Sequence, residues 1–150
     1  MAKQQPRAPK PVGKTVPSKE RIKAALPSAG NSDERISWRF THFDWDGPWT
    51  FADLDEFRSV EKELRDFETM TINELFHNGK EPGKRYEVAR IPEPEALARL
   101  EVLKLADQDE ICRLRVSGTK RLYGFLVGTV FHMVFWDPEH QVWLTEKKHT

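Results

Sequence analysis

The sequence predicts an α+β domain in which two or three helices pack on a mostly antiparallel sheet with a C-terminal β-meander. Apolar residues in the middle of the chain recur at helical spacing, with charged residues on the opposite face. The last forty residues instead show the period-2 alternation of strands. Short turns containing Gly or Pro join these strand-like runs, and short connections favour antiparallel neighbours.

The chain divides into a basic tail and one domain. Residues 1–33 are rich in Lys, Pro, Ser and Ala, with almost no large apolar side chains, so we predict a disordered tail. Residues 34–150 contain enough apolar side chains for a single hydrophobic core. The net charge is zero overall but −9 over residues 31–112 and +3 over residues 113–150. The tail and the C-terminal part are therefore the candidate anion-binding surfaces.

The first half of the domain contains one predicted strand and the clearest predicted helix. Residues 36–43 alternate apolar and polar side chains up to Phe40, which indicates a strand at a sheet edge. Residues 51–67 form a helical pattern with acidic residues in the first turns, where the helix dipole favours them. Its apolar stripe consists of Leu54, Phe57, Val60, Leu64 and Phe67.

Two further helices and a loop complete the helical part. Thr71 and Glu74 match a capping box, which predicts a short helix through Phe76. Residues 80–90 are polar and contain a glycine, so we predict a loop there. Prolines then introduce a third predicted helix over residues 95–105.

The predicted meander has four strands, at residues 111–116, 121–127, 130–136 and 141–145. Asp137 and Pro138 predict a type I turn before the last of them. The third run is apolar on both sides, so we expect it to be the central strand, covered on both faces. Its two predicted faces are Val130, His132, Val134 and Trp136 against Phe131, Met133 and Phe135.

Composition excludes several classes of protein. Cys112 is the single cysteine and alternates toward an apolar strand face, which favours a buried thiol and a reducing, cytoplasmic setting. No apolar stretch reaches the ~18 residues of a membrane span, so no membrane partner is expected. Phosphate-cradling loops, CxxC pairs and the HExxH and GxSxG motifs are absent, and no cofactor is expected.

The candidate functional residues gather toward the C-terminal end. Arg113 and Arg115 alternate to the same side of one strand, where two guanidinium groups offer bidentate donors to phosphate. A solvated strand face is the alternative interpretation. Lys147, Lys148 and His149 supply ammonium groups for a pentavalent phosphate and an imidazole that exchanges protons near neutral pH. The alternative interpretation of these three residues is a frayed, solvated chain end.

A family resemblance covers the same region. The block GTKRLYGFLVGTVFHMVFWDPEHQVW, with its Asp-Pro-x-His turn, resembles the C-terminal signature of a family of small uncharacterised bacterial proteins. Over roughly residues 50–150 the chain further resembles the RelE/ParE-like toxin superfamily. RelE-type members cleave mRNA in the ribosomal A site without metal, using Arg, Lys, His, Tyr or Glu in varying combinations.

This resemblance implies a RelE-like fold and the toxin of a toxin–antitoxin pair, which binds RNA and, as a further hypothesis, acts as an endoribonuclease (an mRNA interferase). The implied partners are RNA or the ribosome and a cognate antitoxin, with no metal. The implied catalytic residues are Arg113, Arg115 and His149. The implied RNA-binding residues are Lys120, Arg121, Lys147 and Lys148.

Two other interpretations stay open on the sequence. The first is a non-enzymatic protein-interaction module that uses the Trp- and Phe-rich sheet and the acidic helices, with the basic tail as its nucleic-acid contact. The second, ranked last, is a metallohydrolase built from His42, Asp44, His132 and His140.

Overall fold

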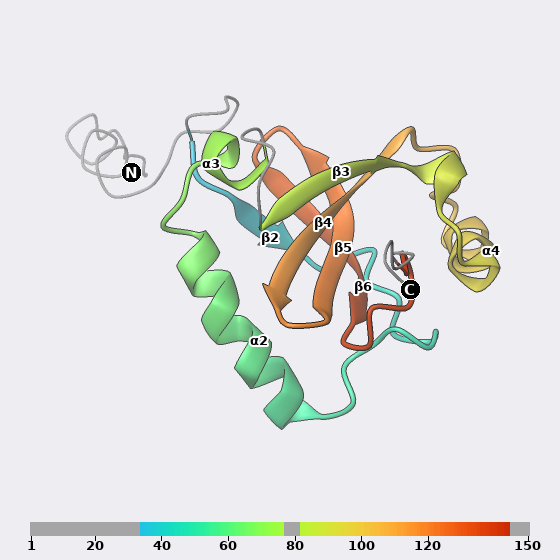
Figure 1. The fold of residues 1–150 in the computed structure, drawn as a ribbon, viewed down its shortest axis with the longest axis horizontal. Helices are drawn as coiled ribbons and strands as arrows, with labels where there is room; N and C mark the ends of the chain where they lie inside the picture. The colour runs from blue at the N-terminus through green and yellow to red at the C-terminus, as the bar shows by residue number, and fades with distance from the viewer. Residues whose placement is uncertain (1–33, 77–81, 145–150) are drawn as a thin grey trace, which may run out of the picture. The chain divides into compact units, whose positions relative to one another are not determined.

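The computed structural model describes residues 34–76 and 82–144, and within them it is an α+β domain. Three α-helices accompany a five-stranded sheet with the order β2-β6-β5-β4-β3 (Figure 1). The helices are α2 (Leu54–Phe67), α3 (Ile72–Phe76) and α4 (Pro94–Val102). The strands are β2 (Ser37–Arg39), β3 (Gly83–Glu87), β4 (Glu110–Ser117), β5 (Lys120–Val127) and β6 (Val130–Asp137). The predicted class, helices on a mostly antiparallel sheet, is confirmed.

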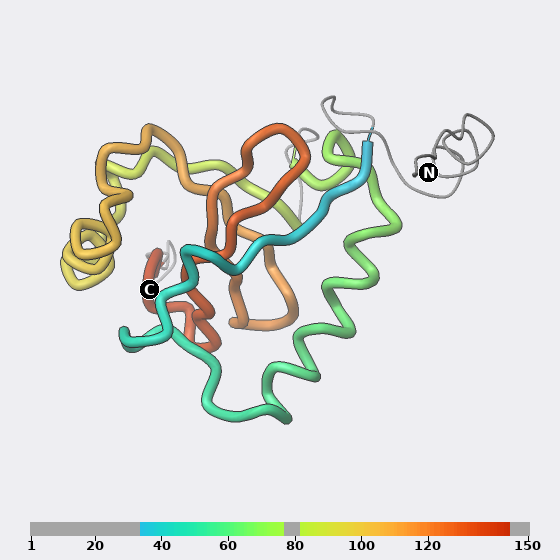
Figure 2. Tube along the Cα trace, turned by 180° about the vertical axis from the view of Figure 1, so that it is seen from behind, coloured from blue at the N-terminus to red at the C-terminus, as the bar shows by residue number. Residues whose placement is uncertain are grey.

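The sheet is antiparallel except at one edge. Strands β4, β5 and β6 form the predicted meander, and β3 pairs antiparallel with β4 at the far edge. The predicted first strand lies at the other edge, where β2 pairs parallel with β6 (Figure 2). It is only three residues long, shorter than the predicted 36–43. The middle of the sheet is β5, so the prediction that the third run would be central was wrong, although β6 is an interior strand.

Two predicted elements were wrong. The polar segment predicted as a loop contains β3 and the 3-10 helix η1 (Val88–Arg90). Its polarity is explained by its edge position, since only one side of an edge strand is paired. The predicted strand from Gln141 is absent among the described residues up to Leu144. The backbone N–H groups of Gln141 and Val142, which a strand would use for pairing, donate to Asp137 instead.

Local side chains determine where the helices begin and end. Helix α2 begins later than predicted because the Asp53 carboxylate accepts a 2.8 Å hydrogen bond from the Glu56 N–H. The predicted capping box is confirmed, because Thr71 and Glu74 bond each other's backbone N–H groups at 3.0 and 2.9 Å. Helix α4 ends three residues before the predicted end, and Lys104 follows with a φ of 63°.

The sheet separates two hydrophobic clusters. Helices α2 and α3 cover one face and α4 lies on the other (Figure 1). Strand residues under α2 and α3 are Cys112, Leu114, Leu122, Phe131, Met133 and Trp136. Those on the α4 side are Ile111, Tyr123, Phe125, Val134 and Phe135.

Cys112 is buried as predicted, and burial raises the pKa of its thiol to about 11, so the thiol is protonated at neutral pH.

A β-bulge changes which residues of β6 face each cluster. Tyr123 pairs with Phe135, but the next residue, Gly124, pairs with Met133, which leaves Val134 as the extra residue. Val134 and Phe135 therefore both lie in the α4-side cluster. The predicted strict alternation was wrong beyond Val134, because Val134 and Phe135 share one face.

Candidate nucleic-acid interface

Four cationic side chains share one face of β3, β4 and β5. In the observed register Lys84 lies opposite Arg113, and Arg115 lies opposite Arg121. Side chains directly opposite each other on antiparallel strands point to the same side, with Cβ atoms about 4.5–5.5 Å apart. The four residues therefore form two adjacent cross-strand pairs staggered over three strands, which we call the basic face. The basic face lies on the same side of the sheet as α4, in the part of that side that α4 does not cover.

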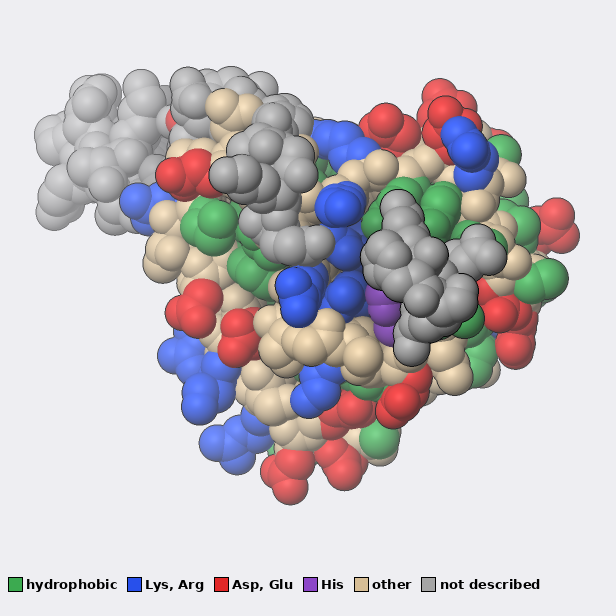
Figure 3. Space-filling view, viewed as in Figure 1, with side chains coloured by type: hydrophobic (Ala, Val, Ile, Leu, Met, Phe, Trp, Pro, Cys, Tyr) green, Lys and Arg blue, Asp and Glu red, His purple; other side chains and the backbone are tan. Residues whose placement is uncertain are grey.

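The basic face contains two exposed and two buried cations. Lys84 and Arg115 are exposed, whereas Arg113 and Arg121 retain only 4% and 7% of their accessible surface. Figure 3 shows Lys and Arg side chains gathered in one band on this side of the molecule, beside a histidine. An anion can contact the exposed pair without any rearrangement, and the buried pair adds to the positive potential there.

Arg121 also stabilises the hairpin between β4 and β5. Its Nη1 group donates to the carbonyl oxygens of Gly118 and Lys120, at 2.5 and 3.2 Å. Lys120, its neighbour in the strand, points to the other side of the sheet, because successive strand residues alternate. The structure thus brings Arg121 together with Arg113 and Arg115, as the resemblance implied, but does not place Lys120 on the basic face.

A buried tyrosine lies next to the basic face. Tyr123 is opposite Arg113 in the register and is fully buried. Burial, and next the charge of Asp137, raise the pKa of its hydroxyl, so the phenol is neutral at physiological pH. Among the described residues this hydroxyl has no hydrogen-bond partner. It is a neutral donor beside Arg113 on the same face of the sheet, and it is buried from solvent.

The turn after β6 brings a histidine to the same end of the sheet. The carboxylate of Asp137 accepts the N–H groups of Gln141 and Val142 at 2.9 and 2.7 Å, which closes the turn. This geometry holds His140 at a φ of 60°, a conformation that is unfavourable for a residue with a Cβ. Partial burial, followed by the charge of Arg121, lowers the pKa of His140. Its imidazole is therefore neutral at pH 7 and can accept a proton.

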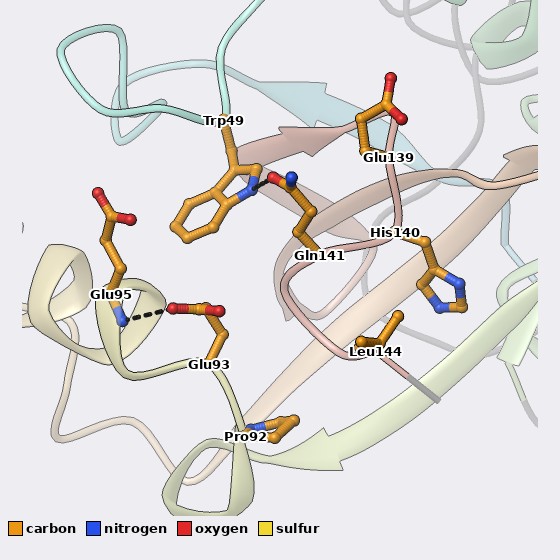
Figure 4. A pocket seen from close by; sticks show the side chains of 8 residues that line it. All are labelled: Trp49, Pro92, Glu93, Glu95, Glu139, His140, Gln141 and Leu144. Atoms are coloured by element: carbon orange, nitrogen blue, oxygen red, sulfur yellow. Dashed lines mark hydrogen bonds between the residues drawn. The ribbon is translucent and has the colours of Figure 1, made fainter. Parts of the chain in front are cut away.

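An acidic cavity adjoins His140 on the side away from the basic face. The cavity has a volume of about 480 Å³ and lies between the start of α4 and the turn after β6 (Figure 4). The Trp49 Nε1 group donates to Gln141 Oε1 at 3.1 Å across it. Its lining residues are Trp49, Pro92, Glu93, Glu95, Glu139, His140, Gln141 and Leu144. Three carboxylates in this lining repel phosphate, so this cavity disfavours an anionic ligand.

The described residues do not assemble the metal site of the last-ranked interpretation. The rings of His42 and His132 lie 5.9 Å apart, but Asp44 is held by Arg99 through two hydrogen bonds of 2.7 and 2.8 Å. His140 follows the opposite end of β6 from His132. No group of three or more His, Cys, Asp or Glu side chains in residues 34–76 and 82–144 is arranged to hold a metal ion.

The sequence interpretation missed three residues of this site and proposed three that cannot be placed. The predicted loop contains Lys84, Tyr123 had no predicted role, and His140 was predicted only as part of the turn and of the last-ranked metal site. Period-2 alternation in β5 would have put Tyr123 beside Arg121, but the contribution of Lys84 required the pairing of β3 with β4. The remaining predicted site residues, Lys147, Lys148 and His149, lie outside the described part of the chain.

Comparison with known proteins adds no identification. Scans against protein-family models, curated proteins and solved structures each found no match to this chain. Among the described helices, none is long and apolar enough to cross a bilayer. The fold and the site together define an α+β domain with a cationic sheet face and an adjacent neutral histidine.

Proposed function

We propose that the basic face binds the phosphate backbone of RNA and that the chain is a RelE-like toxin of a toxin–antitoxin pair. The observation that carries the proposal is the pair of adjacent cationic cross-strand pairs, Lys84 with Arg113 and Arg115 with Arg121. Four cations on one sheet face raise the local positive potential, and two of them, Lys84 and Arg115, are exposed to an incoming anion.

The chemistry of the basic face suits phosphate. Guanidinium groups donate two parallel hydrogen bonds to phosphate oxygens and stay charged at any physiological pH. Release of condensed counterions on binding adds a favourable, salt-dependent contribution. Asp137 pairs in register with Arg121. Both of its carboxylate oxygens accept hydrogen bonds from backbone N–H groups of the turn.

The RelE-like part of the proposal is supported by the position of the cations. Arg113, Arg115 and Arg121 lie on the antiparallel meander that follows helices α2 and α3 in the chain, as the resemblance leads one to expect. A toxin of this kind requires an antitoxin in the cell that produces it. An acidic antitoxin segment that covers the basic face would compete directly with RNA.

The same geometry supports a metal-free cleavage step. In this proposal the neutral imidazole of His140 takes the proton of a ribose 2′-hydroxyl, and the 2′-oxygen attacks the adjacent phosphorus. The 5′-oxygen of the next nucleotide leaves, which produces a 2′,3′-cyclic phosphate and a 5′-hydroxyl end. Arg113 and Arg115 stabilise the charge of the pentavalent phosphorane. The leaving oxygen would take its proton from His149, for which the sequence predicts only proton exchange in general.

Reversing the charge of Arg115 tests RNA binding. Arg115 is exposed, so Arg115→Glu should preserve the fold, whereas truncation of the buried Arg113 would also remove packing. We expect the affinity of the full chain for a single-stranded RNA to fall about tenfold or more, with a smaller dependence on salt. The matched control is Arg65→Glu on α2, whose side chain is 65% exposed. An equal loss in both variants, or no loss in Arg115→Glu, would exclude the basic face as the RNA site.

Replacing His140 by glycine tests cleavage separately from binding. We expect the cleavage rate to fall about 100-fold while RNA affinity is unchanged. Glycine tolerates the φ of 60°, so the free energy of unfolding should stay equal or rise by about 1 kcal/mol. In the intact protein the rate should rise with pH through the lowered pKa of His140, because the neutral imidazole is the base. Unchanged cleavage in His140→Gly, with an RNA lacking the 2′-hydroxyl as the uncleaved control, would remove this role and leave the binding proposal standing.

A further inference from the structure

A second surface, of opposite charge, lies on the connection from β2 to α2 and on the first turns of α2. It is a groove of about 460 Å³. Figure 2 shows the connection running from the edge strand to the start of the helix. We call this surface the aromatic groove. Its lining residues are Phe40, Trp45, Phe51, Asp53, Leu54 and Phe57.

The aromatic groove exposes an unusual amount of apolar surface. The exposed fractions of Phe40, Trp45 and Leu54 are 38%, 56% and 70%. Single exposed apolar residues are ordinary, but several around one concavity indicate an interaction site. These three residues come from the connection and from the first residue of α2, so folding brings them together.

The floor of the groove is held by aromatic packing. Phe51 is buried and stacks on Trp136 of the core, with ring centroids 5.6 Å apart. Phe57 meets Phe51 edge-to-face at 5.0 Å, and Trp45 lies 6.1 Å from Phe51. Because the floor is anchored to the core, a ligand would meet a preformed surface and little ordering entropy would oppose binding.

The charge around the groove identifies the kind of occupant. Residues 39–58, which include the whole lining, contain five acidic side chains and two basic ones, Arg39 and Arg58. Asp44 is paired with Arg99, which leaves Asp46, Asp53, Asp55 and Glu56 near the apolar lining. The dipole of α2 offsets only about half an elementary charge at its N-terminus. The surroundings are therefore negative, which disfavours nucleic acid and anionic lipid surfaces.

We propose that the aromatic groove docks a partner protein through a short segment that carries a large apolar side chain flanked by Lys or Arg. The apolar side chain would fill the concavity between Phe40, Trp45 and Leu54. The flanking cations would meet the carboxylates and the faces of the exposed aromatic rings, where cation–π attraction adds to charge pairing. This site is independent of RNA binding, since its ligand is a basic polypeptide and its charge is opposite to that of the basic face.

Selection from a random peptide library on the full chain tests the proposal. We expect enriched peptides to combine Trp, Phe or Leu with Lys or Arg, and titration calorimetry to show affinity that falls as salt is added. Leu54→Lys should weaken the selected peptides at least tenfold. The matched control is Val102→Lys at the end of α4, which adds the same charge at a side chain of similar exposure, 64%. Trp45→Ser provides a second groove variant should Leu54→Lys fail to fold.

Three outcomes would overturn the proposal. One is the absence of enrichment, or enrichment of acidic peptides. Another is equal weakening by Leu54→Lys and Val102→Lys, which would show that overall charge rather than the groove controls binding. The third is self-association of the intact chain in sedimentation that Leu54→Lys abolishes, which would make a second copy of this chain the occupant.

Discussion

Replacing Gly124 by valine is expected to prevent folding of the domain. Gly124 sits at the β-bulge between β5 and β6. A Cβ there would meet the backbone carbonyl oxygen of His132 and would lie 2.7 and 2.9 Å from atoms of the Phe131 ring. The carbonyl cannot retreat without breaking the pairing of β5 with β6, and Phe131 is fully buried. We expect a loss of about 5 kcal/mol or more, comparable with the total stability of a small domain.

Circular dichroism and urea unfolding of the full chain would measure this loss. The control is Gly128→Ala in the turn between the same two strands, where a Cβ meets nothing within 4 Å. That substitution incurs only the strain of a φ of 63°, about 1–2 kcal/mol. A Gly124→Val protein as stable as the Gly128→Ala protein would contradict the observed register of β5 and β6.

Replacing Asp137 by alanine is expected to destabilise the domain by about 4 kcal/mol. Its fully buried carboxylate accepts the N–H groups of Gln141 and Val142, and Val142 is itself fully buried. Alanine leaves both donors without an acceptor, and each such group costs about 1–3 kcal/mol. It also removes a negative charge that the register places opposite Arg121.

Asp137→Asn is the matched control, because it keeps the shape and one oxygen acceptor while removing the charge. We expect it to lose about half as much stability in urea unfolding. The negative charge of Asp137 raises the pKa of His140 against the larger effects of burial and Arg121. Removing that charge should therefore lower the pKa of His140 further, which NMR titration of the imidazole would detect. An unchanged pKa of His140 in Asp137→Asn would show that this carboxylate does not influence the site.

The basic face and the aromatic groove are built from different elements of the fold, so each can bind its own ligand. The basic face is built by strand register, and the aromatic groove is built by the connection that leads into α2. Variants at Arg115 and Leu54 change exposed side chains on different elements, so their effects on stability should be additive. Each proposed ligand can therefore be tested with the other surface intact.

Local patterns in the sequence predicted much of the fold. The apolar stripe of α2 after Leu54, the capping box at Thr71 and the alternation of β4 depend on residues close together in the chain, and the structure contains all three, whereas Leu54 itself is exposed. Such features are determined by backbone periodicity and by hydrogen bonds within one or two turns. The sequence also indicated that Arg113 and Arg115 share one face.

Long-range contacts decided the rest. Pairing with β4 made residues 83–87 a strand despite their polarity, and it added Lys84 to the basic face. The bulge at Gly124 placed Val134 and Phe135 on one side, which no local alternation predicts.

By itself, then, the sequence determined the α+β class, the amphipathic pattern of α2, the capping box of α3 and a pair of arginines on one strand. The tertiary structure decided that Arg113 is buried, that His140 reaches the same end of the sheet, and that exposed aromatic residues converge on one groove. The physical reason is that burial and proximity depend on which distant segments pack together. Periodicity reports only which side of its own element a residue occupies.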